Sequence, residues 1–211
     1  MKAFIFDLDG VIVFTDKFHY KAWKQMADDM GIYFDETINN RLRGVSRMSS
    51  LEIILERYEG EQLSQERKME LAEKKNDLYR QYLSTMTPDD VSGEVKKTLS
   101  ELRSKGYKLA IGSSSKNAGY ILERVGITDM FDAVSDGTNI TNSKPDPEVF
   151  VKAAEFLGEK PSDCYVVEDA YAGIDAAKAG GMYAVGIGDA AGYDKADFSI
   201  NSFGELLNLP E

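Results

Sequence analysis

The feature of the sequence that most constrains its fold is an alternation of short apolar runs with helical stretches that end at glycine. Continuous apolar runs are typical of strands buried on both faces, and they occur at 3–6, 108–111, 164–167 and 183–187. Helices, each followed by a glycine that can cap it in a left-handed conformation, are predicted at 94–105, 118–125, 147–157 and 172–179. This alternation predicts an α/β fold with a doubly wound, mostly parallel sheet covered on both faces.

One long segment interrupts the alternation. Residues 16–82 show helical spacing and many charges but no strand-like run. Within it, 50–58 and 64–82 are predicted to be amphipathic helices. We therefore expect a helical domain at 16–82, inserted after the first strand of a core domain formed by 1–15 and 83–211.

Charge and cysteine content exclude several classes of protein. The 36 acidic residues exceed the 25 Lys and Arg residues by 11, and no dense basic block occurs, so we expect no nucleic-acid partner. The single cysteine, Cys164, cannot form an intramolecular disulfide and is expected to be a core residue. Because the apolar stretch before Asp7 is too short for a signal peptide and no run approaches a membrane span, we expect a cytoplasmic monomer without a membrane partner.

A pair of carboxylates follows the first predicted strand. Asp7 and Asp9 are two residues apart and tend to project to the same side, and Gly10 permits a sharp exit from the strand. In an open parallel sheet, ligands bind beyond the carboxyl ends of the strands. Repulsion between two neighbouring carboxylates raises one apparent pKa, which lets one stay an anion while the other carries a proton. A simple polar turn would contain the same Asp-x-Asp-Gly pattern.

Polar side chains also follow the second apolar run. They supply hydroxyls and amides before a predicted helix, which is a suitable arrangement for binding phosphate oxygens, and they are Ser113, Ser114, Ser115, Lys116 and Asn117. A serine-rich loop that only caps the helix would look the same.

A lysine and two acidic residues complete the set of candidate site residues near the predicted strand ends. Lys144 precedes a Pro-Asp-Pro segment whose prolines stiffen the backbone and begin a helix, although a loop lysine can equally be a solvated one. Glu168 and Asp169 follow the third apolar run, where they can favour a helix N-terminus. Together with the first carboxylate pair, they can instead supply oxygen ligands for a hard cation, normally Mg²⁺.

These four motifs, in this order and each at a predicted strand end, resemble those of the haloacid dehalogenase superfamily, subfamily I with a helical cap. The resemblance implies a Rossmann-like core with an inserted α-helical cap domain, and phosphoryl transfer through an aspartyl phosphate. It implies that Asp7 is the nucleophile and Asp9 the general acid/base. It also implies that Ser113 binds the phosphate and that Lys144 balances its charge.

The same resemblance implies Mg²⁺ as cofactor. Its ligands would be Asp7, the backbone carbonyl of Asp9, and Asp169, with Glu168 close to the ion.

The inserted segment resembles that of the β-phosphoglucomutase family in two places. The first comprises Thr15, His19 and Trp23, which are spaced four apart and so share one helical face. The second is a sugar-phosphate loop made of Arg43, Gly44, Val45, Ser46, Arg47 and Ser50. Further positions that match the family's substrate contacts are Lys75, Ser115, Lys116 and Asn117. A lone histidine such as His19 can also be a surface residue, and Trp23 can equally belong to the core.

The resemblance implies a mutase reaction on a small sugar phosphate. Phosphorylated Asp7 would transfer its phosphate to β-D-glucose 1-phosphate, and the resulting β-glucose 1,6-bisphosphate would return its 1-phosphate and leave as glucose 6-phosphate. Arg47 could hold the second phosphate bidentately, which a bisphosphate intermediate requires. The alternatives are a sugar-phosphate phosphatase and a non-catalytic phospho-acceptor switch. Phe14, where the family has aspartate, and Ala170, where serine is usual, depart from the pattern.

Overall fold

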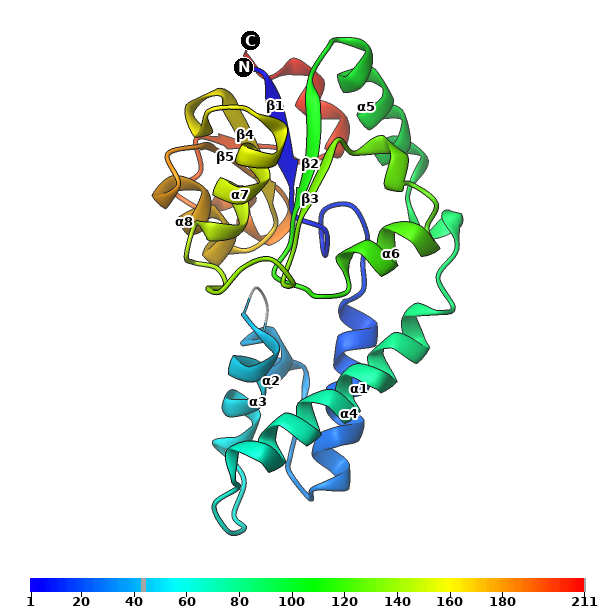
Figure 1. Ribbon diagram of the computed structural model, residues 1–211, viewed down its shortest axis with the longest axis vertical. Coiled ribbons are helices and arrows are strands. Elements are labelled where there is room, and N and C mark those ends of the chain that lie inside the picture. The colour runs from blue at the N-terminus through cyan, green and yellow to red at the C-terminus, as the bar shows by residue number, and fades with distance from the viewer. Residues whose placement is uncertain (43–44, 211) are drawn as a thin grey trace. The chain divides into compact units, whose positions relative to one another are not determined.

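The chain folds into two compact units (Figure 1). The structure is a computed structural model, and it describes residues 1–42 and 45–210. The sheet unit consists of Met1–Phe14 and Met86–Glu211, and the helical unit is Thr15–Thr85. Thr15 and residues 83–85, which the sequence analysis assigned to the core domain, therefore fall in the helical unit.

A single parallel sheet forms the centre of the sheet unit. Its strand order is β3-β2-β1-β4-β5-β6 among the described residues. The strands are β1 (Ala3–Phe6), β2 (Lys108–Gly112), β3 (Ala133–Ser135), β4 (Cys164–Glu168), β5 (Tyr183–Gly186) and β6 (Phe198–Ser199). Phe6 lies opposite Ile111 on one side and Val167 on the other, so β1 is central and its carboxyl end is level with those of β2 and β4. The predicted doubly wound α/β core is confirmed.

Helices cover both faces of this sheet. The α-helices of the sheet unit are α5 (Gly93–Ser104), α6 (Ala118–Arg124), α7 (Glu148–Leu157) and α8 (Tyr171–Ala179). Short 3₁₀ segments are η1 (Pro88–Asp90), η2 (Thr128–Met130), η3 (Pro161–Asp163), η4 (Gly188–Gly192) and η5 (Phe203–Asn208). In Figure 1, α7 and α8 lie on one face of the sheet and α5 and α6 on the other. Gly158 caps α7 with a φ of 69°, as predicted, and Gly181, the second of the two glycines that follow α8, has a φ of 73°.

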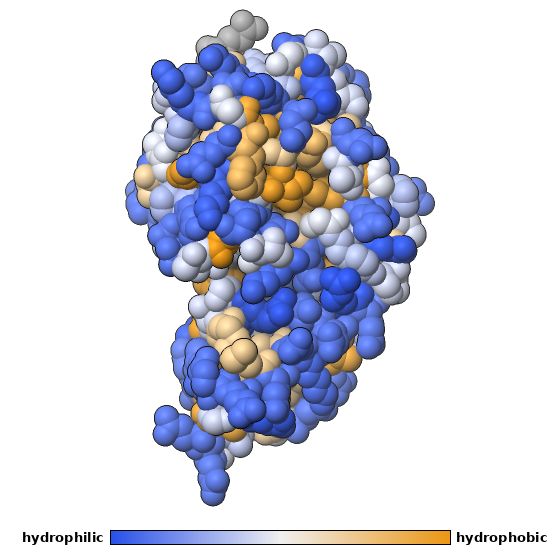
Figure 2. Space-filling view, viewed as in Figure 1, coloured by the Kyte–Doolittle hydropathy of each residue, from blue (hydrophilic) through white to orange (hydrophobic). Residues whose placement is uncertain are grey.

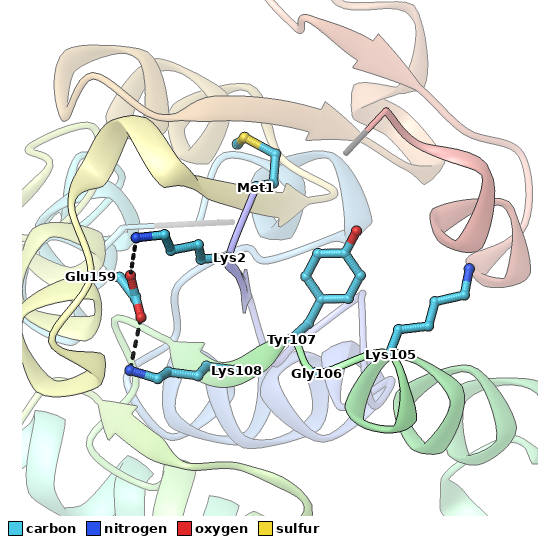
Figure 3. A pocket seen from close by; sticks show the side chains of 7 residues that line it. All are labelled: Met1, Lys2, Lys105, Gly106, Tyr107, Lys108 and Glu159. Atoms are coloured by element: carbon cyan, nitrogen blue, oxygen red, sulfur yellow. Dashed lines mark ion pairs between the residues drawn. The ribbon is translucent and has the colours of Figure 1, made fainter.

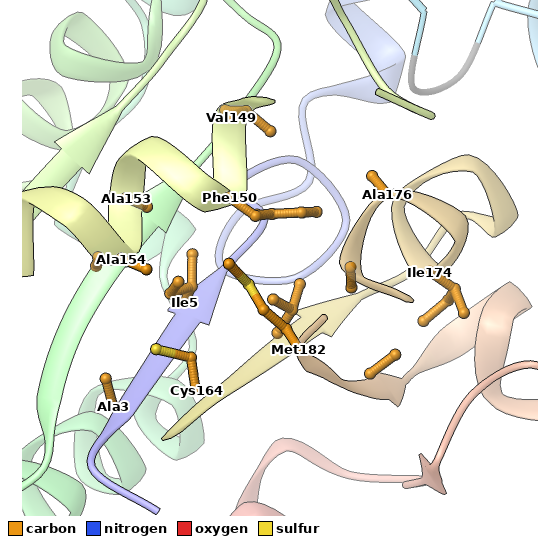
Figure 4. Close-up of a cluster of buried hydrophobic side chains, with 14 of the residues drawn as sticks. Ala3, Ile5, Val149, Phe150, Ala153, Ala154, Cys164, Ile174, Ala176 and Met182 are labelled. Atoms are coloured by element: carbon orange, nitrogen blue, oxygen red, sulfur yellow. The ribbon is translucent and has the colours of Figure 1, made fainter. Parts of the chain in front are cut away.

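The core beneath α7 and α8 anchors the central strands (Figure 4). Phe150 from α7 and Ile174 from α8 belong to one buried cluster with Ile5 from β1. A Cβ at Gly112 would lie 2.5 Å from the Phe150 ring, so only glycine lets α7 approach β2 this closely. Cys164 is fully buried in the same cluster, where burial raises the pKa of its thiol to about 12. The core role expected for this cysteine is confirmed.

The helical unit is built around a second apolar cluster. Its helices are α1 (Asp16–Asp29), α2 (Glu36–Asn40), α3 (Arg47–Leu55) and α4 (Gln65–Leu83). The Ser46 and Ser64 hydroxyls cap α3 and α4 by accepting backbone N–H groups. Trp23, Leu51 and Leu71 meet in the cluster, so α1, α3 and α4 share one core. The predicted helix at 50–58 instead begins at Arg47 and ends at Leu55.

One face of the molecule is mostly hydrophilic (Figure 2). Figure 2 shows charged and polar side chains over most of one face, with apolar side chains gathered in smaller patches. Across residues 1–42 and 45–210, no helix has the length and apolar content needed to cross a membrane.

Candidate active site

Three strand ends bring polar side chains to one edge of the sheet. Asp7 follows β1, Ser113 follows β2, and Glu168 is the last residue of β4. Because these strands are parallel and in register, their ends meet at the same edge. All three residues are buried, with exposed fractions of 7%, 2% and 1%. The sheet thus assembles residues that are far apart in the sequence.

Lys144 joins the two buried carboxylates. Its Nζ lies 2.5 Å from Asp7 Oδ1 and 2.7 Å from Glu168 Oε1, and the residue is 4% exposed. Burial alone would lower the pKa of Lys144, but the charges of Asp7 and Glu168 outweigh it and raise that pKa above its usual value. Lys144 therefore stays a cation inside the site. The ring centroid of Phe150 lies 4.5 Å from the ammonium group.

Asp7 lies in a strongly acidic environment. Burial raises its pKa well above the usual range, and the carboxylates of Glu168, Asp169 and Asp9 add to this effect, while Lys144 opposes it. The site thus holds more negative charge than one lysine balances.

The donor atoms of this cluster suit a hard divalent cation. One carboxylate oxygen from each of Asp7, Glu168 and Asp169 lies within 4.8 Å of the others. Gly10, with a φ of 91°, makes room for this arrangement, because a Cβ there would lie 2.1 Å from Asp169 Oδ2. Gly173 does the same for Glu168, whose Oε1 would be 1.8 Å from an added Cβ. Oxygen-only ligand sets of this kind bind Mg²⁺ and Ca²⁺.

Both oxygens of Glu168 already have partners. Oε1 accepts from Lys144 Nζ, and Oε2 accepts from the backbone N–H of Ala170 at 2.8 Å. The Asp169 carboxylate lies beside the turn at Gly10. Glu168 therefore orients Lys144, whereas Asp169 faces the exit from β1.

The loop after β2 is folded by its own hydroxyl groups. Ser113 Oγ accepts from the backbone N–H of Ser115, and Ser115 Oγ accepts from that of Asn117, both at 3.2 Å. The backbone N–H of Ser113 donates to Ser135 of β3 at 3.0 Å. Asn117 is buried and Lys116 is exposed. The loop is a compact turn tied to β3.

A second polar cluster lies inside the helical unit. Lys75, only 3% exposed, places Nζ 3.0 Å from His19 Nδ1, and 4.5 Å and 4.7 Å from the ring centroids of Trp23 and Tyr79. The Tyr79 hydroxyl donates to Thr15 Oγ1 at 3.1 Å. The structure thus brings the predicted residues Thr15, His19 and Lys75 together, with Trp23 buried in the core beneath them.

Cations surround His19. Burial, followed by the charges of Lys75 and Arg47, lowers the pKa of His19 well below its usual value. His19 is therefore neutral near pH 7 and can accept a hydrogen bond from Lys75. Arg47, the first residue of α3, donates from NH2 to Asn76 Oδ1 at 2.8 Å.

The other residues predicted to bind substrate in the helical unit differ in how deeply they are buried. Val45 is half-buried, Ser46 caps α3 and Ser50 is buried. Arg43 and Gly44 lie outside the described residues. Tyr79, which the sequence analysis did not select, lies four residues after Lys75 and so on the same face of α4; this spacing is the signal that would have indicated it.

A further pocket lies at the opposite edge of the sheet (Figure 3). It measures about 300 Å³ and includes Lys2, Lys105 and Lys108 at the amino ends of β1 and β2. Lys2 and Lys108 both pair with Glu159, and Lys105 donates to the Leu207 carbonyl. The three lysines of this pocket are therefore already paired. The pocket is remote from the carboxylates at the carboxyl ends of the strands.

Comparison with known proteins agrees with the fold and the acidic strand ends. The model of the haloacid dehalogenase-like hydrolases matches residues 1–181, and the chain belongs to this family. Within it, the chain is similar to β-phosphoglucomutase of Bacillus subtilis, with 42% identity over 98% of this chain and 92% of that protein. A crystal structure of β-phosphoglucomutase from Clostridium difficile superimposes with a TM-score of 0.91 at 39% identity, covering 98% of this chain and 93% of the other.

The similarity also extends to phosphatases. A phosphorylated carbohydrates phosphatase of Thermotoga maritima is 30% identical over 86% of this chain and 82% of that protein. The shared scaffold therefore accommodates more than one phosphate acceptor.

Proposed function

We propose that this chain is a β-phosphoglucomutase that interconverts β-D-glucose 1-phosphate and glucose 6-phosphate through an aspartyl phosphate and β-glucose 1,6-bisphosphate. The observation that carries the proposal is the presence of two separate sets of buried or half-buried cations. Lys144 serves the carboxylate site of the sheet unit, and Lys75 and Arg47 form a second set in the helical unit. A sugar bisphosphate needs a cation set for each phosphate, whereas a phosphatase needs only one. The 42% identity to a β-phosphoglucomutase supports the same function.

In this proposal Asp7 is the nucleophile. A carboxylate oxygen of Asp7 forms a bond to phosphorus while the bond from phosphorus to the sugar oxygen breaks. Lys144, in contact with Asp7 Oδ1, favours the anionic nucleophile and balances charge on the transferring phosphate. Ser113, at the adjacent strand end, donates its hydroxyl to a phosphate oxygen.

Asp9 is the general acid and base. When Asp7 takes the phosphate from the sugar phosphate, Asp9 gives a proton to the sugar oxygen that leaves phosphorus. In the reverse transfer, Asp9 takes the proton from the sugar hydroxyl that attacks the aspartyl phosphate. Asp9 lies on a turn that is closed by a hydrogen bond, in which the backbone N–H of Gly10 donates to the Val13 carbonyl at 2.7 Å. This closed turn, two residues from Asp7, supports the role proposed for Asp9.

The cofactor proposed for the acidic cluster is Mg²⁺. Asp7, Asp169 and the backbone carbonyl of Asp9 would bind the ion, and Glu168 would hold Lys144 beside it. When bound, the ion neutralises charge on the phosphate oxygens.

The substrate is a small sugar phosphate. Arg47 is proposed to hold the phosphate that is not transferred, because its planar guanidinium suits bidentate binding. Neutral His19 and Lys75 are proposed to bind the sugar, with Thr15 and Trp23 supporting them. Other proposed contacts come from Arg43, Gly44, Val45, Ser46, Ser50, Ser115, Lys116 and Asn117.

A coupled assay tests this function. β-Glucose 1-phosphate is supplied with Mg²⁺ and a trace of glucose 1,6-bisphosphate, and glucose 6-phosphate and free phosphate are measured in the same tube. We expect glucose 6-phosphate without stoichiometric phosphate, and no product from Asp7→Asn. Phosphate release without glucose 6-phosphate would contradict the mutase proposal and favour a sugar-phosphate phosphatase, the alternative that the Thermotoga maritima relative supports.

A further inference from the structure

Lys144, the cation that joins Asp7 and Glu168, lies on a loop without regular secondary structure. The loop comprises residues 136–147, between β3 and α7. The Lys144 ammonium group has to reach two carboxylates at once in a buried site. Because a lysine side chain is a flexible four-carbon stem, its ammonium group keeps such a position only if the backbone that carries it is held in place.

Glu148, the first residue of α7, binds this loop from the helix side. Its Oε2 accepts the backbone N–H of Thr141 at 2.9 Å and that of Asn142 at 2.8 Å. Thr141 and Asn142 are exposed, so without Glu148 their N–H groups would bond to water and the loop would lose this tie to α7. One carboxylate oxygen thus fixes the backbone two and three residues before Lys144.

The other oxygen of Glu148 is held by a second cation. Glu148 Oε1 pairs with Lys152 Nζ at 2.8 Å, one turn further along α7, and the same ammonium group donates to the Asn139 carbonyl in the loop. The bond from Lys152, followed by the two backbone N–H groups, lowers the pKa of Glu148 to about 2. Glu148 therefore holds the loop as a carboxylate at neutral pH.

The first turn of α7 is a firm support for the loop. Val149 and Phe150 are fully buried in the cluster beneath α7 and α8 (Figure 4). Asp146 Oδ1 accepts the backbone N–H of Glu148 at 2.9 Å, which ties the end of the loop to the helix. Lys144 is thus supported twice from this turn: the Phe150 ring contacts its ammonium group, and Glu148 holds the backbone that precedes it.

We infer that Glu148 is a positioning residue for phosphoryl transfer, which acts through the loop backbone to keep Lys144 in contact with Asp7 and the transferring phosphate. Both oxygens of Glu148 are occupied by the loop and by Lys152, so Glu148 does not itself contact the reacting atoms. The inference rests on the proposed function only in that phosphate is transferred to Asp7, and it does not depend on which acceptor follows.

The test compares Glu148→Ala and Glu148→Gln with Glu155→Ala, a control that removes an exposed carboxylate from the same helix. Glutamine loses the charge but keeps an oxygen that can accept the loop N–H groups. Turnover of acetyl phosphate, which can phosphorylate Asp7 without any sugar, is measured with Mg²⁺ well below the unfolding temperature of each variant.

We expect kcat to fall at least about tenfold in Glu148→Ala while KM changes less than about threefold, because a small displacement of Lys144 affects the transition state more than binding. The Gln variant should recover kcat to within about threefold of the wild type, since the loop contacts are restored. Glu155→Ala should match the wild type in both parameters.

A second measurement follows Lys144 itself. Each protein is treated briefly with acetic anhydride, and acetylation of individual lysines is read by mass spectrometry. Lys144 should be protected in the wild type and acetylated faster in Glu148→Ala. Lys75, a buried lysine of the helical unit, is the internal reference, because only general unfolding would expose it as well.

The outcomes separate this inference from general destabilisation and from the mutase proposal. Unchanged kcat in Glu148→Ala overturns the inference, as does an equal loss in the Ala and Gln variants. A rise in acetylation at Lys75 as large as that at Lys144 also overturns it. If Glu148→Ala shows the expected loss but the wild type releases phosphate instead of making glucose 6-phosphate, the inference stands and the mutase proposal fails.

Discussion

The ammonium group of Lys75 lies 3.0 Å from Nδ1 of His19, a contact that requires the imidazole to be neutral. A protonated ring would carry N–H at both nitrogens and could not accept from Lys75. Burial and the charges of Lys75 and Arg47 lower the pKa of His19, so the contact persists at neutral pH. The consequence is a defined dependence of stability on pH.

His19→Gln should remove part of that dependence, because glutamine keeps an acceptor but does not titrate. The folded pKa of His19 lies below its unfolded value near 6.5, so its contribution is complete above about pH 6.5 and is lost as the pH falls. We expect the loss of unfolding free energy between pH 7.5 and 5.5 to be about 1 kcal/mol larger in the wild type than in the variant. Urea unfolding of both proteins at the two pH values measures this difference. Equal losses in the wild type and the variant would refute the assignment of a neutral His19.

Lys144→Met should abolish activity and destabilise the metal-free protein. The variant leaves the buried carboxylates of Asp7 and Glu168 without a cation, which costs about 3 kcal/mol at pH 8. The loss should shrink toward pH 5, because the raised pKa of Asp7 lets the folded state bind a proton there. Thermal unfolding with a chelator present checks this. Lys97→Met, at an exposed position on α5, should change stability little; a penalty at Lys144 that is the same at both pH values would argue against the assignment.

Gly10→Ala should weaken binding of Mg²⁺ by at least about tenfold, since its Cβ would displace the Asp169 carboxylate. Gly31→Ala is a matched control: Gly31 also has a positive φ, 69°, but an added Cβ there meets nothing within 4 Å. Both variants should lose about 1 kcal/mol of stability from backbone strain. Calorimetric titration with Mg²⁺ separates them, and unchanged affinity in Gly10→Ala would remove Asp169 from the proposed ligands.

Arg47→Ala should raise KM for β-glucose 1-phosphate by about tenfold or more, because it removes a charged contact to the second phosphate. Turnover of acetyl phosphate, which has one phosphate and no sugar, should be unchanged. Arg67→Ala provides the control, since Arg67 is an exposed residue of α4 whose guanidinium pairs with Glu70 at the surface. An equal loss with both substrates would place Arg47 in the phosphoryl-transfer step or in folding.

The central strands could be predicted from the sequence because they are buried on both faces. β1 begins and ends where its apolar run does, and β4 extends one residue further to Glu168. β3 and β6 were not predicted, because they are three and two residues long and partly exposed, and so leave no apolar run. Helix α2 has only five residues, too few for a helical period to be visible.

Because ligands bind beyond the carboxyl ends of parallel strands, the sequence could predict which side chains gather at that edge of the sheet. It could not predict how those side chains pair. Lys144 and Asp7 are 137 residues apart, and only the folded chain reveals that one ammonium group touches Asp7 and Glu168 together. The backbone N–H groups that Glu148 accepts belong to a loop without regular secondary structure, whose path no periodicity in the sequence indicates.

The helical unit is one uninterrupted stretch, Thr15–Thr85, and its two ends join the sheet unit outside every strand. Such a stretch behaves as a genetic cassette: it can be exchanged by two cuts without breaking the sheet or separating Asp7 from Lys144. Evolution can therefore alter the acceptor through this cassette while the phosphorylating apparatus is inherited intact. A chimera that carries the corresponding stretch of a phosphatase relative should keep the acidic cluster and change only where the phosphate goes.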